Sequence, residues 1–250
     1  MTRAKLADGE ILVLRTCLAG LTSYGGFQWP RSGHVEAPDW IGDDRCGHGL
    51  HGLPWGEGGR QYLSEALDAA WLVVKVSTAA GNYRAGTGQL TDKCKFRAGE
   101  VVYCGDRMRA VQLVDESAPA GTVTHWASQT AGHVSAQKAG DCSTQTAGYA
   151  STQKAGYDST QKAGYASTQK AGDDSTQEAG DDSTQKAGSH STQRAGDGTV
   201  QVGRWYDGRW RVATRVVTEA EADKWYLFER GVWRPCTPAE ADKAERKVSD

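Results

Sequence analysis

Tyr-Ala-Ser-Thr-Gln-Lys-Ala-Gly (149–156) is one copy of an eight-residue unit that is repeated ten times between His125 and Arg204. The copy before it reads Asp-Cys-Ser-Thr-Gln-Thr-Ala-Gly (141–148), and the copy after it reads Tyr-Asp-Ser-Thr-Gln-Lys-Ala-Gly (157–164). The first two copies and the last copy are degenerate. A fixed short period indicates identical units stacked on one another, so this array predicts a solenoid.

Each unit predicts a short strand followed by a turn. In Ser-Thr-Gln-Lys, alternation sends Ser151 and Gln153 inward and Thr152 and Lys154 outward. Glycine takes positive φ without steric cost, which places the turn at Ala-Gly, and its recurrence disfavours a helix. Two units per turn predict coils of about sixteen residues, stacked about 4.8 Å apart like strands in a sheet. Ten units then make about five coils.

The interior predicted for such a coil consists of Ala, Ser and Gln. Buried polar groups need hydrogen bonds, and stacked Gln and Ser side chains supply them between neighbouring coils. The alternative is a disordered low-complexity segment rich in Gly, Ser, Gln and Lys. The unbroken period and the aromatic-rich segment that follows the array favour the solenoid.

The unit Ala-Gly-Tyr-x-Ser-Thr-Gln-Thr, which residues 147–156 match closely, resembles the repeats of bacterial ice-nucleation proteins. The resemblance implies a flat β-solenoid, Thr-x-Thr rows that order water on one face, and a tyrosine ladder that takes part in assembly. It makes Tyr149 and Tyr165 a possible dimer ladder. The candidate water-facing or ice-facing residues are Thr144, Thr146, Thr152, Thr160, Thr168, Thr176, Thr184 and Thr192.

The departures from that pattern affect the expected function. Only Thr144-Gln-Thr146 keeps Thr-x-Thr among the regular copies, because the second threonine is otherwise replaced, mostly by a basic residue. Two units per coil predict one basic column: Lys138, Lys154, Lys170 and Lys186. The opposite column is mixed: Thr130, Thr146, Lys162, Glu178 and Arg194. Mobile ammonium groups repel each other and disturb ordered water. The resemblance implies that the family's terminal coils carry basic residues in place of Thr and take part in assembly. Because this array is more similar to those coils than to the Thr-x-Thr coils, we expect weak ice nucleation or none.

Composition excludes several other classes of protein. The chain has 250 residues and a net charge of −2, which argues against a nucleic-acid partner. It has no apolar run long enough to span a membrane and no signal-peptide core at its start, which predicts a cytoplasmic protein without a membrane partner. The six cysteines are scattered, so free thiols are expected. No phosphate loop or dinucleotide motif appears, and no cofactor is predicted.

Residues 1–118 predict a small α+β domain of unknown role. Strands are expected at Ile11–Arg15, Trp71–Val76 and Glu100–Cys104, and a short helix at 61–70 with Ser64 as its cap. This half resembles an uncharacterised domain of bacterial and phage proteins. The matching pieces are Arg15-Thr-Cys17, Gly26-Phe-Gln-Trp29 and Cys46-Gly-His-Gly-Leu-His-Gly52.

Cys46, His48 and His51 form the one constellation in this half that could carry chemistry. Their spacing suits three zinc ligands, with Cys17, Cys94 or Cys104 as the fourth. Two alternatives stay open. The glycines around them also describe a tight structural loop, and Cys46 with His51 could form a nucleophile and base, for which the sequence identifies no orienting acid.

Residues 205–250 predict a β-rich cap. Asp207-Gly208 between aromatic runs indicates a hairpin, residues 224–228 and 232–234 read as strands, and Thr237-Pro238 opens a short helix. Because a solenoid end exposes unpaired strand edges, we expect this segment to cover one. An aromatic surface that binds carbohydrate or a protein partner is the alternative.

The sequence thus predicts a mainly β protein with a solenoid at 119–204 between the two flanking segments. The favoured hypothesis is a non-enzymatic structural or interaction scaffold that self-associates through a side or an end of the solenoid. One alternative is an ice-binding or ice-nucleating protein whose threonines contact water or an ice surface. The other is an enzyme or metal site in the N-terminal domain.

Overall fold

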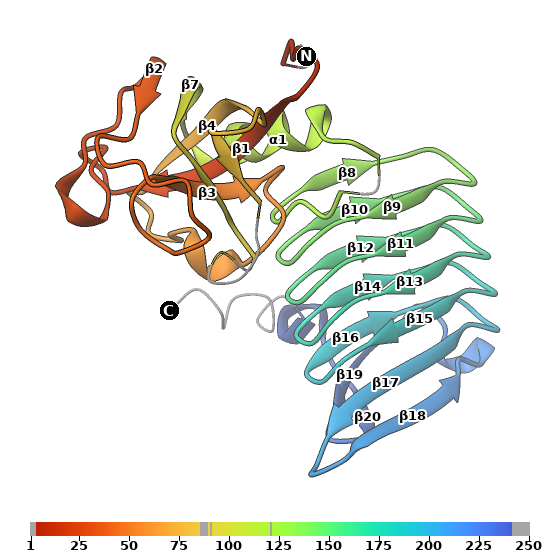
Figure 1. The fold of residues 1–250 in the computed structure, drawn as a ribbon. Coiled ribbons are helices and arrows are strands. Elements are labelled where there is room, and N and C mark those ends of the chain that lie inside the picture. Colours follow the sequence, from red (N-terminus) through yellow and green to blue (C-terminus); the bar gives the residue numbers. More distant parts are fainter. Residues whose placement is uncertain (1–3, 86–89, 91, 121, 242–250) are drawn as a thin grey trace. The chain divides into compact units, whose positions relative to one another are not determined.

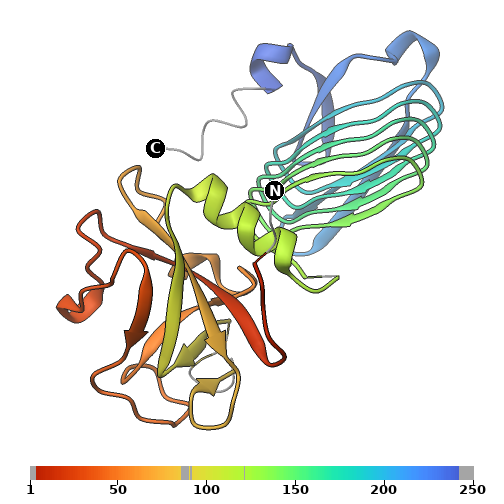
Figure 2. The same ribbon diagram turned by 90° about the horizontal axis from the view of Figure 1, so that it is seen from above.

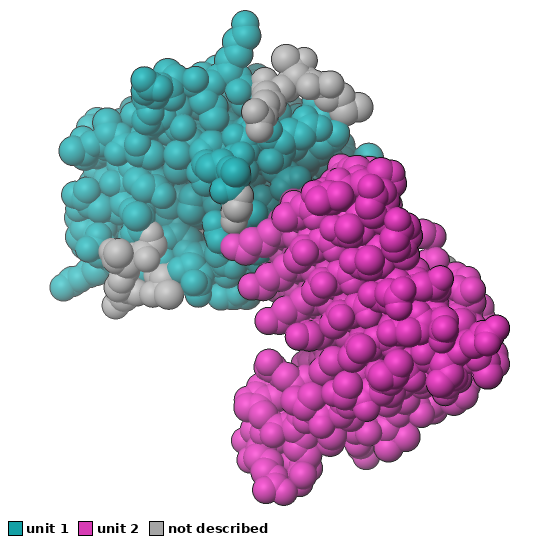
Figure 3. Space-filling model, turned by 90° about the vertical axis from the view of Figure 1, so that its right-hand side faces the viewer, with its two compact units in different colours: residues 1–125 teal, residues 126–250 magenta. Residues whose placement is uncertain are grey.

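The computed structural model describes residues 4–241 except 86–89, 91 and 121. Residues 1–125 and 126–250 form two compact units (Figure 3). Both are built mainly from strands, so the predicted fold class is confirmed (Figure 1). The repeat array and the C-terminal segment lie in the second unit, and β17 (Val200–Tyr206) runs across position 204.

The first unit is a seven-stranded antiparallel sheet in the order β2-β7-β4-β1-β3-β6-β5. Its strands are β1 (Glu10–Cys17), β2 (Gly33–Glu36), β3 (Leu50–Pro54), β4 (Ala70–Ser77), β5 (Tyr83–Arg84), β6 (Cys94–Phe96) and β7 (Ala98–Gly105). The strands predicted at 11–15, 71–76 and 100–104 are confirmed as β1, β4 and β7. Alternation along β1 and β4 buries apolar side chains on both faces of the sheet, among them Val13, Leu14, Leu72 and Val73.

The helix of this unit is α1 (Arg107–Ser117), which the sequence analysis missed. Asp106 caps it by accepting a hydrogen bond from the Arg109 N–H at 2.9 Å, and Ala110, Val111 and Val114 are buried along one face. The helix predicted at 61–70 is wrong. The 3-10 turn η2 (Arg60–Tyr62) is followed by extended backbone, because the Ser64 N–H donates to Thr16 Oγ1 at 2.7 Å instead of continuing a helix. A second 3-10 turn, η1, spans Tyr24–Gly26.

The second unit begins with a flattened solenoid, whose stacked coils are seen in Figure 2. Residues sixteen apart pair in parallel and in register, for example Gln145 with Gln161, so each coil holds two repeats, as predicted. One sheet, here called the first solenoid sheet, contains β8 (Ser128–Thr130), β10 (Thr144–Thr146), β12 (Thr160–Lys162), β14 (Thr176–Glu178) and β16 (Ser191–Arg194). The second solenoid sheet contains β9 (Ala136–Lys138), β11 (Thr152–Lys154), β13 (Thr168–Lys170), β15 (Thr184–Ala187) and β17.

Polar side chains fill the solenoid, in agreement with the sequence prediction. Ser151 and Gln153 are buried, and Thr152 and Lys154 are exposed. The Gln153 amide donates to Oε1 of the glutamine one coil earlier at 2.9 Å and to the Lys162 carbonyl at 3.0 Å. Serines form a second ladder, in which the backbone N–H of Ser151 donates to Ser167 Oγ at 3.2 Å.

The turns differ from the prediction in one respect. Positive φ occurs at the second residue of each unit, such as Ala150 (52°) and Asp158 (52°), and not at the repeat glycine. The glycine is needed because the coils approach closely there. A Cβ on Gly180 would lie 2.7 Å from the backbone nitrogen of Tyr165.

The C-terminal segment caps the last coil, as predicted. β18 (Trp210–Val216) pairs antiparallel with β17, and β19 (Trp225–Glu229) pairs antiparallel with β16 and with β20 (Val232–Pro235). The hairpin turn has Gly208 at φ 92°. The 3-10 turn η4 (Glu219–Glu221) connects β18 to β19. Thr237 caps a helical turn at 238–241, because its Oγ1 accepts a hydrogen bond from the Glu240 N–H at 3.2 Å. The rest of the predicted helix lies outside the described residues.

Aromatic side chains close the end of the polar interior. Phe228 on β19 is fully buried and lies 5.7 Å, ring centre to ring centre, from Trp205 and 4.6 Å from Trp233. It faces Gly203, where a Cβ would clash with the Phe228 ring. The cap thus replaces the hydrogen-bonded glutamine core with an apolar one.

Candidate functional site

The outward positions of the solenoid strands carry the threonines predicted to face water. Thr144 and Thr146 on the first solenoid sheet are exposed, as are Thr152 and Thr168 on the second. Thr160 and Thr184 are half-buried. Thr152 and Thr168 pair in register on neighbouring strands, so their hydroxyls form part of one row.

Thr176 and Thr192 do not face water, which corrects the sequence prediction for these two residues. They are 8% and 1% exposed, and their hydroxyls hydrogen-bond each other at 3.1 Å. Both lie at the end of the first solenoid sheet where β19 adds to β16, opposite Leu227 in the case of Thr192. The repeat pattern could not predict this burial, because the C-terminal segment that covers this end lies outside the repeats.

The second outward position on the second solenoid sheet is basic in four successive coils. Strand register places Lys138, Lys154, Lys170 and Lys186 on neighbouring strands, one behind the other. All four side chains are exposed. Within the described part of the chain, no acid lies within ion-pair distance of Lys154, Lys170 or Lys186. We call these four residues the lysine column.

The corresponding column on the first solenoid sheet is compensated. Glu178 lies 3.2 Å from Lys162 and 3.0 Å from Arg194, measured between carboxylate oxygen and side-chain nitrogen. Arg194 also lies 3.4 Å from Asp223. The two faces therefore differ in charge: acids neutralise the mixed column, whereas Lys154, Lys170 and Lys186 have no acid within ion-pair distance among the described residues.

Tyr149 and Tyr165 stack on one edge of the solenoid. Their ring centres are 5.2 Å apart and the planes are nearly parallel, at 7°. His133 continues the stack at 4.4 Å from Tyr149, and Asp181 occupies the same position two repeats after Tyr165. Tyr165 is 56% exposed and Tyr149 37%, so the stack presents a short aromatic strip.

Aspartates at the same repeat position make a contact that the sequence analysis missed. Asp141 Oδ1 accepts the backbone N–H of Tyr157 at 2.9 Å, Asp173 accepts that of Ser189 at 2.9 Å, and Asp181 accepts that of Asp197 at 3.0 Å. Each carboxylate thus caps the next coil. The sequence signal for this contact is Asp at the first position of the repeat, because Asp side chains often accept hydrogen bonds from nearby backbone N–H groups in turns.

The neighbouring residue Asp174 is half-buried near His190. Burial raises the pKa of the Asp174 carboxyl, and the charge of His190 opposes the shift. Oδ1 of Asp174 lies 3.8 Å from Nδ1 of His190.

The zinc hypothesis for Cys46, His48 and His51 is not supported. Among the residues that the structure describes, no three His, Cys, Asp or Glu side chains are grouped so that they could hold a metal ion. Cys46 Sγ accepts a hydrogen bond from Lys93 Nζ at 3.1 Å, and His48 Nδ1 lies 3.4 Å from Asp39 Oδ2. His51 lies on β3 and lines the same pocket as Cys46 and His48.

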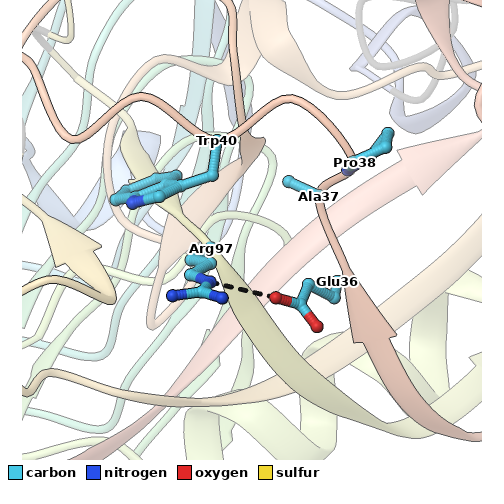
Figure 4. A pocket seen from close by; sticks show the side chains of 5 residues that line it. All are labelled: Glu36, Ala37, Pro38, Trp40 and Arg97. Atoms are coloured by element: carbon cyan, nitrogen blue, oxygen red, sulfur yellow. Dashed lines mark hydrogen bonds and ion pairs between the residues drawn. The ribbon is translucent and has the colours of Figure 1, made fainter.

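A pocket of about 600 Å³ lies at the edge of the first unit (Figure 4). Trp40 and Arg97 extend toward it, and Arg97 Nε bonds Glu36 Oε1 at 2.9 Å. The charged groups of Glu36 and Arg97, which line this pocket, therefore neutralise each other. The Glu36 side chain is exposed, and its hydrogen bond from Arg97 lowers the pKa of its carboxyl.

Curated proteins similar to this chain share one description. An ice nucleation protein of Pseudomonas syringae is 38% identical over 117 residues, which cover 46% of this chain and 10% of that protein. The ice nucleation protein InaU of Pantoea ananas is 33% identical over 109 residues, and one of Pseudomonas fluorescens is 32% identical over 108 residues. The chain is similar to ice nucleation proteins. No family model and no solved structure matches it.

The similarity has a limited extent. The chain spans about a tenth of the length of the ice nucleation proteins it matches. Its solenoid of about five coils is consistent with ice-nucleation-like repeats. Within the described residues, no helix has the length and apolar character needed to cross a membrane.

Proposed function

We propose that this chain is a non-enzymatic structural or interaction scaffold built around a short ice-nucleation-like solenoid, with weak ice nucleation or none. The observation that carries the proposal is the lysine column. Ordering water requires a flat, regular row of hydroxyls, whereas ammonium groups on neighbouring strands repel one another. The threonine row of the second solenoid sheet is also short, because Ala136 and Val200 flank Thr152, Thr168 and Thr184.

A droplet-freezing assay on the full chain tests this function. We expect droplets with the protein to freeze at the temperature of the buffer control. The matched variant changes all four residues of the lysine column to threonine, which restores Thr-x-Thr in three successive coils. A control variant changes Lys75, on β4 of the first unit, to threonine. Freezing of the unmodified chain well above the buffer control would overturn the proposal.

The second candidate is an ice-binding protein that acts on existing ice. The exposed residues Thr144, Thr146, Thr152 and Thr168 favour it, since they present hydroxyls at strand spacing. Thermal hysteresis measures this activity directly. Loss of a measurable hysteresis in Thr152→Lys with Thr168→Lys, but not in Lys75→Thr, would favour ice binding over the scaffold.

We propose that the scaffold binds further copies of itself. The exposed Tyr149–Tyr165 stack supports contact through a side of the solenoid. Analytical ultracentrifugation of the chain and of Tyr149→Ser with Tyr165→Ser tests it. A concentration-dependent dimer that the double variant lacks is expected, and a monomer in both proteins would contradict it. Cytoplasmic location and the lack of nucleic-acid and membrane partners stay predictions.

A further inference from the structure

A second pocket of the first unit, of about 800 Å³, lies among glycine-rich loops. This volume is in the range of small-molecule sites. Phe27, Pro38 and Leu50 provide apolar lining, and the charged or polar groups come from β1, β3 and the loops around Cys46 and Lys93. The scaffold function does not use this pocket.

Arg15 on β1 lines the pocket with a guanidinium that has no acid partner among the described residues. Its Nη1 donates to the His51 carbonyl at 3.0 Å, and its Cζ lies 4.0 Å from the centre of the Trp29 ring. Nε is buried and makes no hydrogen bond within the described residues, which also place no carboxylate within ion-pair distance of Arg15. Burial lowers the pKa of Arg15, opposed by the nearby Cys17 thiol. Arginine nevertheless stays protonated in proteins, and an unpaired cation out of water is costly.

A second cation lies at the same pocket. Lys93 Nζ is 3.1 Å from Cys46 Sγ and 4.4 Å from the centre of the Tyr62 ring. Of the described residues that line the pocket, one is an acid: Asp39, which lies beside His48. The pocket thus carries more positive than negative charge.

His51 adds a neutral polar group. Burial and the charges of Lys93, Arg15 and Lys95 lower the pKa of His51 to about 4, so its ring is neutral at pH 7. Its Nε2 is buried and has no hydrogen-bond partner in the part of the chain that the structure describes. Lys95 is satisfied separately, by Asp43 Oδ1 at 2.7 Å and the Arg45 carbonyl at 2.9 Å.

We propose that this pocket binds a small organic molecule through a carboxylate or phosphate group, with Arg15 and Lys93 as its charged contacts. A guanidinium presents a planar fork of donors that matches both kinds of oxyanion. Such a group would supply the counter-charge that Arg15 lacks. The apolar lining would contact the uncharged part of the ligand.

Titration calorimetry on the full chain tests the ligand chemistry with benzoate, phenyl phosphate and neutral benzyl alcohol. We expect saturable binding of one or both anions and none of the alcohol. Binding of benzoate alone identifies a carboxylate ligand, and binding of phenyl phosphate alone identifies a phosphate ligand. Equal binding of all three probes, or of none, would overturn the proposal.

Variants then test the two cations. Lys93→Ala should raise the Kd of the bound anion about tenfold or more, the usual loss for one charged hydrogen bond. Arg15→Gln should abolish binding, with folding checked by circular dichroism. Lys75→Ala, which removes a cation paired with Glu100 at 2.8 Å, is the matched control and should bind like the unmodified chain. Unchanged binding in Lys93→Ala would contradict the assignment even if Arg15→Gln fails to fold.

Discussion

Gln161 donates a hydrogen bond from Nε2 to Oε1 of Gln145, one coil earlier, at 2.9 Å. The same amide donates to the Lys170 carbonyl on the opposite sheet at 3.1 Å, and its own Oε1 accepts from Gln177 at 2.8 Å. One fully buried side chain therefore joins neighbouring coils and both sheets. The ladder has a direction, because every Nε2 points to the earlier coil, so at its last members, Gln193 and Gln201, a buried Oε1 is left without a partner among the described residues.

Replacing Gln161 with methionine should destabilise the solenoid. The substitution keeps the approximate size but leaves Gln145 Oε1 and a Gln177 Nε2 donor unpaired. Each buried polar group without a partner costs about 1–3 kcal/mol, so we expect a loss of at least about 2 kcal/mol in the free energy of unfolding. Urea unfolding followed by circular dichroism measures it.

Two controls belong to this measurement. Gln201→Met, at the end of its ladder, should cost less, because it leaves one acceptor unpaired and removes another that is already unpaired. Lys154→Met, on an exposed position, should change little. Equal losses in Gln161→Met and Lys154→Met would refute the role of the amide ladder.

Gly180→Ala should destabilise the stack, and Gly132→Ala should not. The two glycines hold the same position in the repeat, but a Cβ on Gly180 would meet the backbone of Tyr165 while one on Gly132 meets nothing within 4 Å. Neither glycine has positive φ, so the difference measures close packing and not backbone strain. Overpacking costs about 1–3 kcal/mol. Thermal unfolding of both variants compares them, and a similar melting point for the two would contradict the packing argument.

Much of the solenoid could be predicted because its information is local and repeated. The period fixes two units per coil, and alternation separates Gln153 from Thr152. The burial of Thr176 and Thr192 could not be predicted, since it depends on β19, which lies far along the sequence. The helix at 61–70 failed because the backbone of Ser64 bonds Thr16, a tertiary contact. The pocket lined by Arg15 and Lys93 could not be predicted either, because segments distant in sequence form it.

Phe228→Ala should open the capped end. Removing a fully buried phenyl ring costs about 3–5 kcal/mol, here by leaving a cavity against Trp205, Trp233 and Gly203. The loss should be largest in β16, β17 and β19, read as faster amide exchange in peptides from these strands. Val232→Ala, at a position 64% exposed, is the control. If exchange in β16 and β17 stays unchanged in Phe228→Ala, the cap does not stabilise the last coil.

The stability of the first unit should fall as the pH drops from 6.5 toward 4, and His51 should account for a distinct part of the fall. Burial, followed by the charge of Lys93, lowers the pKa of His51 from 6.5 to about 4. Between these values the unfolded chain binds more protons than the folded chain, so stability is present above pH 6.5 and is lost as the pH falls. His51→Gln removes this contribution and should flatten the dependence. Amide exchange of β1 and β3 peptides across this range measures it, with exposed His34→Gln as the control. Parallel loss of protection in the unmodified chain and in His51→Gln would assign the acid sensitivity to other groups, since the exposed imidazole of the unfolded chain binds a proton in this pH range and glutamine cannot.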